Sequence, residues 1–428
     1  DPIERAHIHG QIYEALSELH IQPSGIPKAI IPELAWHAEQ AGRINRAIEH
    51  YRQAGQWALR VSANEEAAAH FKRALALVHR LPDGRRRMER ELTLQLDLAV
   101  PLIALRSWGA PEVEEAYRRA LTLSKTLGDS PQLMRALDGI RAYHHVRSEY
   151  QAALTVAEDY YRQSQTLKDP VAHLLGPFPK GAVLLFVGEF EQSLSYLNAL
   201  LSRYDPDAHQ ALMFKMGQDP AVVSRSFAVY DLWYMGYPDQ ARQMAETSVA
   251  YATEIEHPFS LFFALNFKGR LHRWLGEVPQ VHRLTDQQWT LWTRYGVELG
   301  RVGAMLGRGW VLAQEGETER AIAQYKDALA AFQSTGMTNH LTEFWSVLAE
   351  IYAKAGQLQQ ALNLLGETID RIEETGERYH EAEVYRLRGE IRLQTDPEDV
   401  AGAEADLRQA LEVAVAQKAR MLELRAAM

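Results

Sequence analysis

The chain has 428 residues, of which 46% are hydrophobic and 24% charged, and its formal net charge is -10 at pH 7. This length exceeds one ordinary hydrophobic core, so we expect either several domains or one elongated repeat structure. The acidic balance disfavours nonspecific binding to nucleic acid or anionic membranes, and the sequence has no apolar run of about 18 residues that could span a bilayer. The absence of cysteine excludes disulfides and thiolate metal sites, and we expect a cytoplasmic protein.

The first 20 residues, DPIERAHIHGQIYEALSELH, are predicted to form an amphipathic helix. They begin at Asp1 without an initiator Met or a signal-peptide pattern, so we expect the chain to be a piece of a longer protein. A basic stretch, HRLPDGRRRMERE at residues 79–91, is either a nucleic-acid patch or a solvated linker that enters a charged helix start. We favour the linker because the whole chain is acidic, and we expect no nucleic-acid partner.

An internal repeat organises most of the chain. A turn glycine, a small residue five positions later and an apolar helical period occur together in GYPDQARQMAETSVAYA from Gly236, GETERAIAQYKDALAAF from Gly316 and GQLQQALNLLGETIDRI from Gly356. Each is interpreted as the turn and second helix of a helical hairpin. The interval between turns is 40 residues from 108 to 188 and from 236 to 356, but 48 residues from 188 to 236. The equivalent turn positions are Gly42, Ser62, Trp108, Ser148, Gly188, Gly236, Gly276, Gly316, Gly356 and about Glu398.

Small residues recur seven positions before the turn, as at Gly269, Gly309 and Ala349, and they let two helices approach closely. No hairpin can bury its apolar face alone, so the hairpins must stack. The nearest strand signal, PFPKGAVLLFVG from Pro177, is predicted to be helical because of its place in the repeat. We therefore predict an all-α fold, a right-handed superhelical solenoid of about ten antiparallel helix hairpins of about 40 residues. The offsets resemble the tetratricopeptide repeat (TPR), whose usual period is about 34 residues, so longer helices are implied.

The longer interval falls in YDPDAHQALMFKMGQDPAVVSRSFAVYDL, residues 204–232. Within it, Asp219 and Pro220 predict a helix start, with Asp at the N-cap and Pro at the first helical position. The remaining extra residues have no such explanation, and loops longer than a fold requires often carry function. We therefore treat residues 204–222 as an inserted loop with the candidate binding residues His209, Lys215, Gln218 and Asp219.

Several separated motifs resemble one family of bacterial signalling proteins. Its members join a class III nucleotide cyclase or similar output domain to a predicted ATPase and a C-terminal TPR (MalT-like) region, a STAND-type architecture. The motifs are the segment above with WYMGYPDQA after it, HPFSLFFAL from His257, TGERYHEAEVYRLRGE from Thr375, and LELRAA near the C-terminus. The first hundred residues, with AEQAGRINRAIEHYRQAGQWALRVSANEEAAAHFKRAL, resemble the region just after the ATPase. The resemblance implies a regulatory or sensing arm, with energy use and output chemistry elsewhere.

We accordingly divide the chain into six segments. The last of them, residues 419–428, has an unpaired apolar face at Met421, Leu422 and Leu424, which is expected to associate with other apolar surfaces. The segments are an N-terminal helix and connection from an upstream ATPase module (1–33), first repeats (34–81), middle repeats (82–203), the inserted loop (204–222), C-terminal repeats (223–418), and the truncated start of a further hairpin (419–428).

Catalytic motifs are absent from the sequence. It contains no G-x-x-x-x-G-K-[ST] phosphate loop, and the glycines of GRVGAMLGRGW from Gly300 are interpreted as packing positions in a first helix. It also lacks G-x-S-x-G and H-E-x-x-H. The pairs His340 with Glu343 and His380 with Glu383 have metal-compatible i,i+3 spacing, but no second carboxylate motif completes a site. We expect no enzyme, no cofactor and no metal, and an enzyme on a helical scaffold is the least favoured alternative.

In repeats of this type, the first helix of each hairpin lines the concave surface. Counting back from each turn predicts a groove that changes from aromatic and basic to acidic, where aromatic rings supply contact area and Asn or Arg orients a ligand. The alternative is that these aromatic residues form the core between hairpins. Of the adjacent His144 and His145, one is expected to line the groove. The candidate binding residues are Arg225, Tyr230, Trp233, Tyr234, Phe263, Asn266, Arg270, Trp274, Trp310, Gln314, Glu343, Glu350, Glu383 and Arg386.

Two functional hypotheses stay open. The first is a noncatalytic sensor or interaction arm of a signalling ATPase or cyclase, which binds a protein, peptide or small ligand on its concave face. The second is an autoinhibitory or oligomerisation scaffold, which packs on its own ATPase or cyclase modules or on a second copy and takes no external ligand. The sequence does not name the ligand, because one solenoid fold binds unrelated partners.

Overall fold

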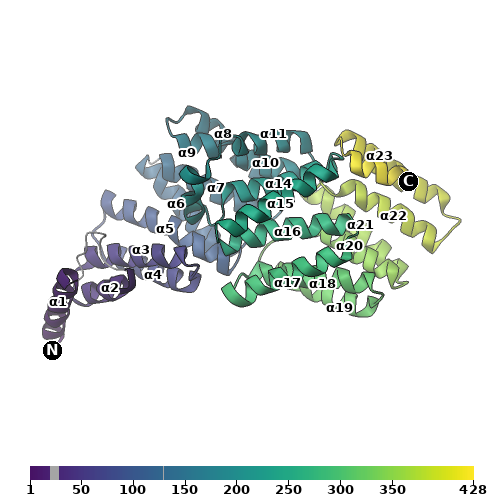
Figure 1. Cartoon of the computed structure of the whole chain (residues 1–428). Helices are drawn as coiled ribbons and strands as arrows, with labels where there is room; N and C mark the ends of the chain where they lie inside the picture. Colours follow the sequence, from purple (N-terminus) through teal and green to yellow (C-terminus); the bar gives the residue numbers. More distant parts are fainter. Residues whose placement is uncertain (20–27, 129) are drawn as a thin grey trace. The chain divides into compact units, whose positions relative to one another are not determined.

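The computed structural model describes residues 1–19, 28–128 and 130–428. Residues 20–27 of the expected N-terminal connection lie outside this range. Throughout the described residues the chain forms helices and turns and no strand, arranged as a TPR-like solenoid of antiparallel hairpins, as predicted (Figure 1). The chain divides into two compact units: unit 1 holds Asp1–Leu105 and Glu112–Ala136, and unit 2 holds Arg106–Pro111 and Leu137–Met428.

Unit 1 contains the first helices, and the predicted N-terminal helix is present. The turns at Gly42 and Ser62 have positive φ angles of 74° and 58°, as their place between two helices requires. The elements are α1 (Pro2–Leu19), the 3-10 turn η1 (Lys28–Ile30), α2 (Ile31–Gln40), α3 (Ile44–Arg60), α4 (Asn64–Val78), α5 (Arg85–Leu105) and α6 (Pro111–Leu127), and α7 (Ser130–Val146) continues into unit 2.

The basic stretch at residues 79–91 enters helix α5, and two of its arginines pair with acidic residues. Arg87 pairs with Asp83, and Arg85 Nε lies 2.9 Å from a carboxylate oxygen of Glu89. These pairs have the i,i+4 spacing typical of an exposed helix start, which supports the linker interpretation over a nucleic-acid patch.

Unit 2 contains the remaining hairpins. The segment from Pro177, the nearest strand signal in the sequence, is helical as predicted. The elements are α8 (Tyr150–Thr166), α9 (Pro170–Leu175), α10 (Pro177–Phe186), α11 (Phe190–Leu201), α12 (Pro206–His209), η2 (Gln210–Leu212), α13 (Met213–Met216), α14 (Pro220–Tyr234), α15 (Pro238–Glu254), α16 (Pro258–Trp274), α17 (Val278–Tyr295), α18 (Glu298–Gln314), α19 (Thr318–Ser334), α20 (Leu341–Lys354), α21 (Leu358–Thr375), α22 (Glu381–Thr395), α23 (Val400–Ala416) and α24 (Arg420–Ala427).

The repeat's small residues act as the sequence predicts. The turn glycines Gly316 and Gly356 have φ angles of 85° and 74°, a left-handed conformation that a side chain resists. Ala321 and Ala361 are fully buried in the second helices. A Cβ atom on Gly309 would lie only 3.1 Å from Tyr325, so helices α18 and α19 approach too closely for a larger residue.

The expected inserted loop is folded rather than open. Between α11 and α14 it forms α12, η2 and α13 and ends at Gly217, whose φ angle is 78°. Asp219 then caps α14 as predicted, because its carboxylate accepts hydrogen bonds from the backbone N–H of Ala221 (2.9 Å) and Val222 (3.0 Å), with Pro220 in the first turn.

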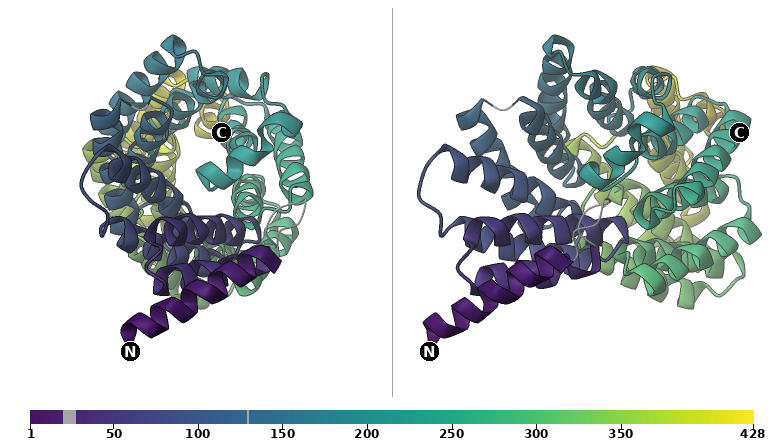
Figure 2. Two further views of the ribbon diagram at one scale, coloured as in Figure 1. Left: turned by 90° about the vertical axis from the view of Figure 1, so that its left-hand side faces the viewer. Right: turned by 60° about the vertical axis from the view of Figure 1, so that its left-hand side comes forward.

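Unit 2 winds until late turns meet early ones. The carbonyl of Val146 accepts hydrogen bonds from the backbone N–H of Thr338 (2.7 Å) and Asn339 (3.0 Å). The carbonyl of Phe186 similarly accepts from Arg378 (2.8 Å) and Tyr379 (3.2 Å). The turns before α20 and α22 therefore contact the C-terminal ends of α7 and α10, about 190 residues earlier in the chain, so that successive superhelical turns touch (Figure 2).

The C-terminal segment corrects one expectation. Leu422, predicted to belong to an unpaired sticky face, is only 1% exposed, because helix α24 packs against α14, α22 and α23. Leu424 faces outward, with 56% of its surface exposed. The apolar face of α24 is thus largely satisfied within unit 2.

Candidate ligand-binding cavity

A cavity of about 110 Å³ lies inside unit 2. Its wall comes from helices α7, α10, α14, α16, α18, α19 and α20, from the segment before α14, and from the turns that hold Trp108 and residues 337–340. A cavity of roughly 150 Å³ accommodates a benzene ring, so this one suits a group of that order of size. Nine aromatic side chains line it, namely Trp108, Phe178, Phe227, Phe259, Phe262, Phe263, Phe267, Phe332 and Phe344.

Helical periodicity explains why these side chains converge. On α16, the lining residues Phe259, Phe263, Asn266 and Arg270 are spaced by four, three and four positions, which places them on one face of the helix. Helices α7 and α18 contribute lining residues at the same kind of spacing. The first helices of successive hairpins therefore turn one face each toward a common interior.

Polar groups interrupt the apolar wall. Arg141 is 5% exposed and donates to Asp138 Oδ1 from Nε (3.1 Å) and Nη2 (2.7 Å), while its Cζ atom lies 5.5 Å from the ring centre of Phe178. His145 and Asn339 are each 4% exposed. Within the described part of the chain, His145 Nδ1 and Asn339 Oδ1 have no hydrogen-bond partner. Burial, helped by the charge of Arg141, holds the pKa of His145 well below its usual value.

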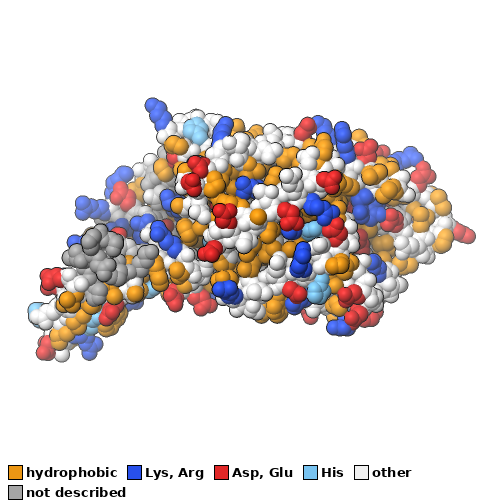
Figure 3. Space-filling view, in the orientation of Figure 1, with side chains coloured by type: hydrophobic (Ala, Val, Ile, Leu, Met, Phe, Trp, Pro, Cys, Tyr) orange, Lys and Arg blue, Asp and Glu red, His pale blue; other side chains and the backbone are white. Residues whose placement is uncertain are grey.

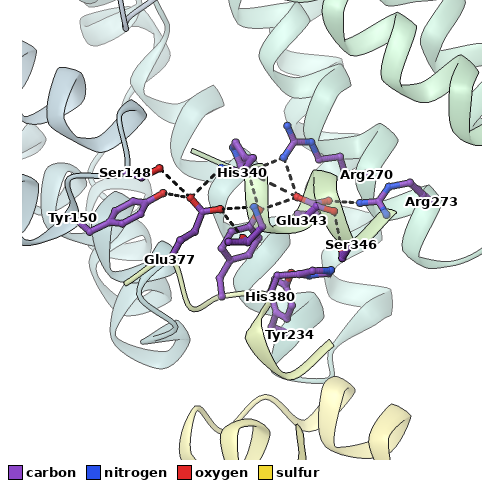
Figure 4. A network of polar contacts seen from close by, with 12 residues as sticks. Ser148, Tyr150, Tyr234, Arg270, Arg273, His340, Glu343, Ser346, Glu377 and His380 are labelled. Atoms are coloured by element: carbon purple, nitrogen blue, oxygen red, sulfur yellow. Dashed lines mark hydrogen bonds and ion pairs between the residues drawn. The ribbon is translucent and has the colours of Figure 1, made fainter. Parts of the chain in front are cut away.

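A buried ion cluster supports one wall of the cavity (Figure 4). Glu343, on α20, is fully buried and accepts from Arg270 Nη1 (3.0 Å) and Tyr379 OH (2.9 Å), and it also pairs with Arg273. Burial by itself would raise the pKa of Glu343, but the charges of Arg270 and Arg273 outweigh it, so the pKa is lowered. Arg270 Nη1 also lies 2.7 Å from His340 Nδ1. Burial, followed by the Arg270 charge, lowers the pKa of His340 well below its usual value, so this imidazole is neutral.

A second buried carboxylate joins two superhelical turns (Figure 4). Glu377 accepts from the hydroxyls of Tyr150 (2.6 Å), Thr342 (2.6 Å) and Ser148 (3.3 Å). It also accepts from the backbone N–H groups of His340 and Thr342, both at 3.2 Å, at the start of α20. Burial raises the pKa of Glu377, and the hydrogen bonds from Thr342 and Tyr150 oppose that rise.

These clusters are not arranged as a metal centre. The pair His340 and Glu343 has the expected i,i+3 spacing, but both side chains are occupied by the arginine cluster. His380 instead bonds to Tyr234 OH through Nδ1 at 2.9 Å. Over the residues that the structure describes, no three His, Asp or Glu side chains are placed to hold a metal ion, and no helix is both long and apolar enough to cross a membrane.

Four of the predicted binding residues line the cavity. Phe263, Asn266 and Arg270 reach it from α16, and Gln218 reaches it from the inserted loop. Of the two adjacent histidines, His145 lines the cavity. His144 instead points to Glu149.

The aromatic residues of α14 are placed differently from the prediction. Tyr230, Trp233 and Tyr234, expected on the concave surface, are at most 2% exposed and lie in the core. The expectation is wrong for them because α14 contacts α10, α11, α15, α16 and α24, which leaves only Arg225 of this helix unburied. Trp310 is likewise a core residue, with 5% exposure. The alternative interpretation of these aromatic positions, as core between hairpins, is therefore the correct one.

The prediction that one end of the groove is acidic is also wrong. Glu383, like Glu343, is buried, and it accepts hydrogen bonds from Arg386 and Arg425 (both 2.7 Å to Oε1), so its charge is neutralised internally. Burial raises the pKa of Glu350. On the face of the molecule shown in Figure 3, acidic and basic side chains are interspersed over helices α14–α23.

The other predicted residues make structural contacts. Trp274 stacks on Trp233 with ring centres 4.4 Å apart, and Gln314 accepts from Lys354 Nζ at 2.6 Å. The guanidinium of Arg225 lies 5.0 Å from the ring centre of Tyr251.

In the inserted loop, His209 Nδ1 accepts from the backbone of Asp205 (2.9 Å), and Lys215 is exposed. Asp219 is fully buried as the N-cap and also accepts from Tyr204 OH at 2.5 Å.

Sequence reasoning missed the contribution of the earlier hairpins. Asp138, Phe178, Asn266 and Leu306 all line the cavity, and each lies ten positions before its turn residue, at Ser148, Gly188, Gly276 and Gly316 respectively. Counting back from every turn would have found the lining residues on α7 and α10. No local pattern identifies Asn339, because it reaches the cavity only through the contact between superhelical turns.

These features define the chain as a TPR-like helical repeat protein with a lined interior cavity. No family model matches the sequence. Among curated proteins, it is 22% identical over 433 residues to an uncharacterized protein, R02095, of Rhizobium meliloti (strain 1021); the match covers 99% of this chain and 41% of that protein's length.

Among solved structures, a Rap protein complexed with competence and sporulation factor matches 86% of this chain and 99% of its own, with a TM-score of 0.62 and 13% identity. The Rap conjugation gene regulator of plasmid pLS20, in complex with the Phr* peptide, matches 88% and 97%, with a TM-score of 0.54 and 13% identity. At these identities the two structures establish the fold that the chain shares with them.

Proposed function

We propose that unit 2 is a noncatalytic binding module whose ligand occupies the interior cavity. The whole chain then serves as the sensor or interaction region of a larger signalling protein. The motif resemblance to ATPase and cyclase signalling proteins supports this context, and so does the greater length of the R. meliloti relative, of which this chain spans 41%. The two Rap structures, one with competence and sporulation factor and one with the Phr* peptide, are complexes of the same fold.

The observation that carries the proposal is the pair of buried, unpartnered polar atoms at the cavity, His145 Nδ1 and Asn339 Oδ1. Leaving a buried polar group without a partner costs about 1–3 kcal/mol. The remaining wall is largely aromatic, which supplies contact area, while a few polar groups fix orientation. A ligand with matching polar atoms would satisfy both groups at once.

The test is a cavity-filling substitution with a matched control. Ala142 is buried at the cavity wall, so Ala142→Leu places three further heavy atoms into the space. Ala152 is exposed on α8, and Ala152→Leu makes the same chemical change away from the cavity. We expect Ala142→Leu to remove copurified ligands in native mass spectrometry. We also expect it to weaken the binding of such a ligand, once isolated, at least about tenfold. Equal ligand content and affinity in the two variants, with both folded, would contradict the proposal.

The scaffold alternative has one observation in its favour. Helix α1 exposes Ile3, Ile8 and Ile12, and among its residues only Gly10 and Tyr13 are buried. Ile8 and Ile12 are four positions apart and therefore share one face of the helix. An exposed apolar face of this kind can pack on another module or on a second copy. Light scattering over a hundredfold concentration range tests this alternative: self-association that Ile8→Glu abolishes would support it, and a concentration-independent monomer would exclude the second copy.

A further inference from the structure

The charged side chains that line the cavity are unequal in number. Arg141 is neutralised by Asp138, whereas Glu343 is shared between Arg270 and Arg273. Glu350 also acts on Arg273. Of the charged side chains that line the cavity itself, two are guanidinium groups, Arg141 and Arg270, and one is a carboxylate, Asp138, so the wall has one more cation than anion. A buried, incompletely paired cation is costly, and an anion placed next to it is correspondingly favoured.

Arg270 shares its only carboxylate partner with Arg273, and it also has hydrogen-bond donors that are not used. The bonds of Arg270 to His340 and Glu343 both leave from Nη1, and the hydroxyl of Tyr230 also interacts with this guanidinium. A guanidinium has five N–H donors, so these three contacts leave donors unused. Its Cζ atom lies 4.7 Å from the ring centre of Phe344 and 5.9 Å from that of Phe267, so the guanidinium is held between aromatic walls. A planar guanidinium fixed in this way matches the two oxygens of a carboxylate.

His145 and, with its amide reversed, Asn339 can donate to the same group. With the proton of the neutral His145 imidazole on Nδ1, that nitrogen becomes a donor, and the amide of Asn339 offers donors when it is oriented with nitrogen inward. The aromatic wall formed by residues such as Phe227, Phe263 and Phe267 suits an apolar body.

We infer that the cavity binds an apolar group about the size of a phenyl ring that carries one carboxylate, with Arg270 as its main charge partner. This inference rests on the proposed function and specifies its ligand. Two sources provide the same chemistry: a free small carboxylic acid, and the C-terminal residue of a peptide. Arg270 acts as a binding residue here, and Arg273 keeps Glu343 paired.

The first experiment uses the full chain and three probes of nearly equal shape. Isothermal titration calorimetry compares phenylacetate, its neutral analogue phenylacetamide and the cation phenethylamine. We expect phenylacetate to bind at least about tenfold more tightly than the amide, because a charged hydrogen bond is stronger than a neutral one, and the cation to bind most weakly. A hexapeptide ending in Phe, measured as free acid and as amide, identifies a peptide source through the same preference for the acid.

The second experiment removes the cation. In Arg270→Gln the preference for acid over amide is expected to vanish, and in the control Arg408→Gln, whose exposed pair with Glu404 is remote from the cavity, it is expected to remain. If circular dichroism shows that Arg270→Gln is unfolded, Arg141→Gln is measured instead and is expected to reduce the preference.

The outcomes distinguish a failure of the carboxylate assignment from a failure of the proposed binding function. Equal affinity for acid and amide overturns the carboxylate assignment while the binding function stands. If no acid or amide binds in either form, the carboxylate assignment also fails; if the chain in addition carries no copurified molecule that Ala142→Leu removes, the proposed function fails with it.

Discussion

The buried carboxylate Glu343 provides the sharpest test of what holds unit 2 together. It is fully buried, and its two guanidinium partners Arg270 and Arg273 are 11% and 12% exposed in their side chains. The substitution Glu343→Gln keeps the shape but removes the charge, so it leaves two nearly buried cations without their counter-ion. Breaking a buried pair in this way costs about 3–5 kcal/mol. For a unit of this size, about 2 °C is lost per kcal/mol, so the melting temperature should fall by roughly 6–10 °C.

The assay is thermal and urea unfolding followed by circular dichroism, with Glu404→Gln as the matched control. Glu404 pairs with Arg408 at i,i+4, and both side chains are more than 60% exposed, so its loss should cost under about 0.5 kcal/mol. The double variant Glu343→Gln with Arg273→Gln should recover part of the loss, because one of the unpaired cations is then gone. A cost below about 1 kcal/mol for Glu343→Gln, or no recovery in the double variant, would refute the reasoning.

Two further predictions follow from the turns and from the buried histidines. At Gly356 (φ 74°) and Gly366 (helical) an added Cβ meets no atom within 4 Å, so Gly356→Ala should lose about 1 kcal/mol through backbone strain, whereas Gly366→Ala should gain about 0.5–1 kcal/mol; equal effects in urea unfolding would contradict this reading. Burial lowers the pKa of His145, His340 and His380, the last to about 4, so the stability these groups contribute is present above their unfolded pKa of about 6.5 and is lost as pH falls toward 4. Urea midpoints at pH 7.5, 6 and 5 should decline in that order, and a midpoint that stays level would count against neutral, buried imidazoles.

The hairpins could be predicted from the sequence because their causes are local. Turn glycines such as Gly316, the alanines that follow them and the N-cap Asp219 each act within a few residues, and all behave as expected. The chemistry of the interior could not be predicted in the same way. Glutamates such as Glu343 and Glu383 are expected on the exposed face of a first helix. Both are buried instead, because arginines from other helices compensate their charges.

The contact between superhelical turns is the feature that local sequence patterns predict least, because it joins residues about 190 positions apart. The segment that makes this contact also lines the cavity. In the segment 337–340, the backbone N–H of Asn339 donates to Val146 while its side chain faces the interior, and the adjacent His340 touches Arg270. Val146 itself lines the cavity. A group that contacts Asn339 or Arg270 therefore acts on the residues that join one turn of the superhelix to the next. A ligand in the cavity and the contact between superhelical turns thus involve the same residues, so a change in one alters the free energy of the other.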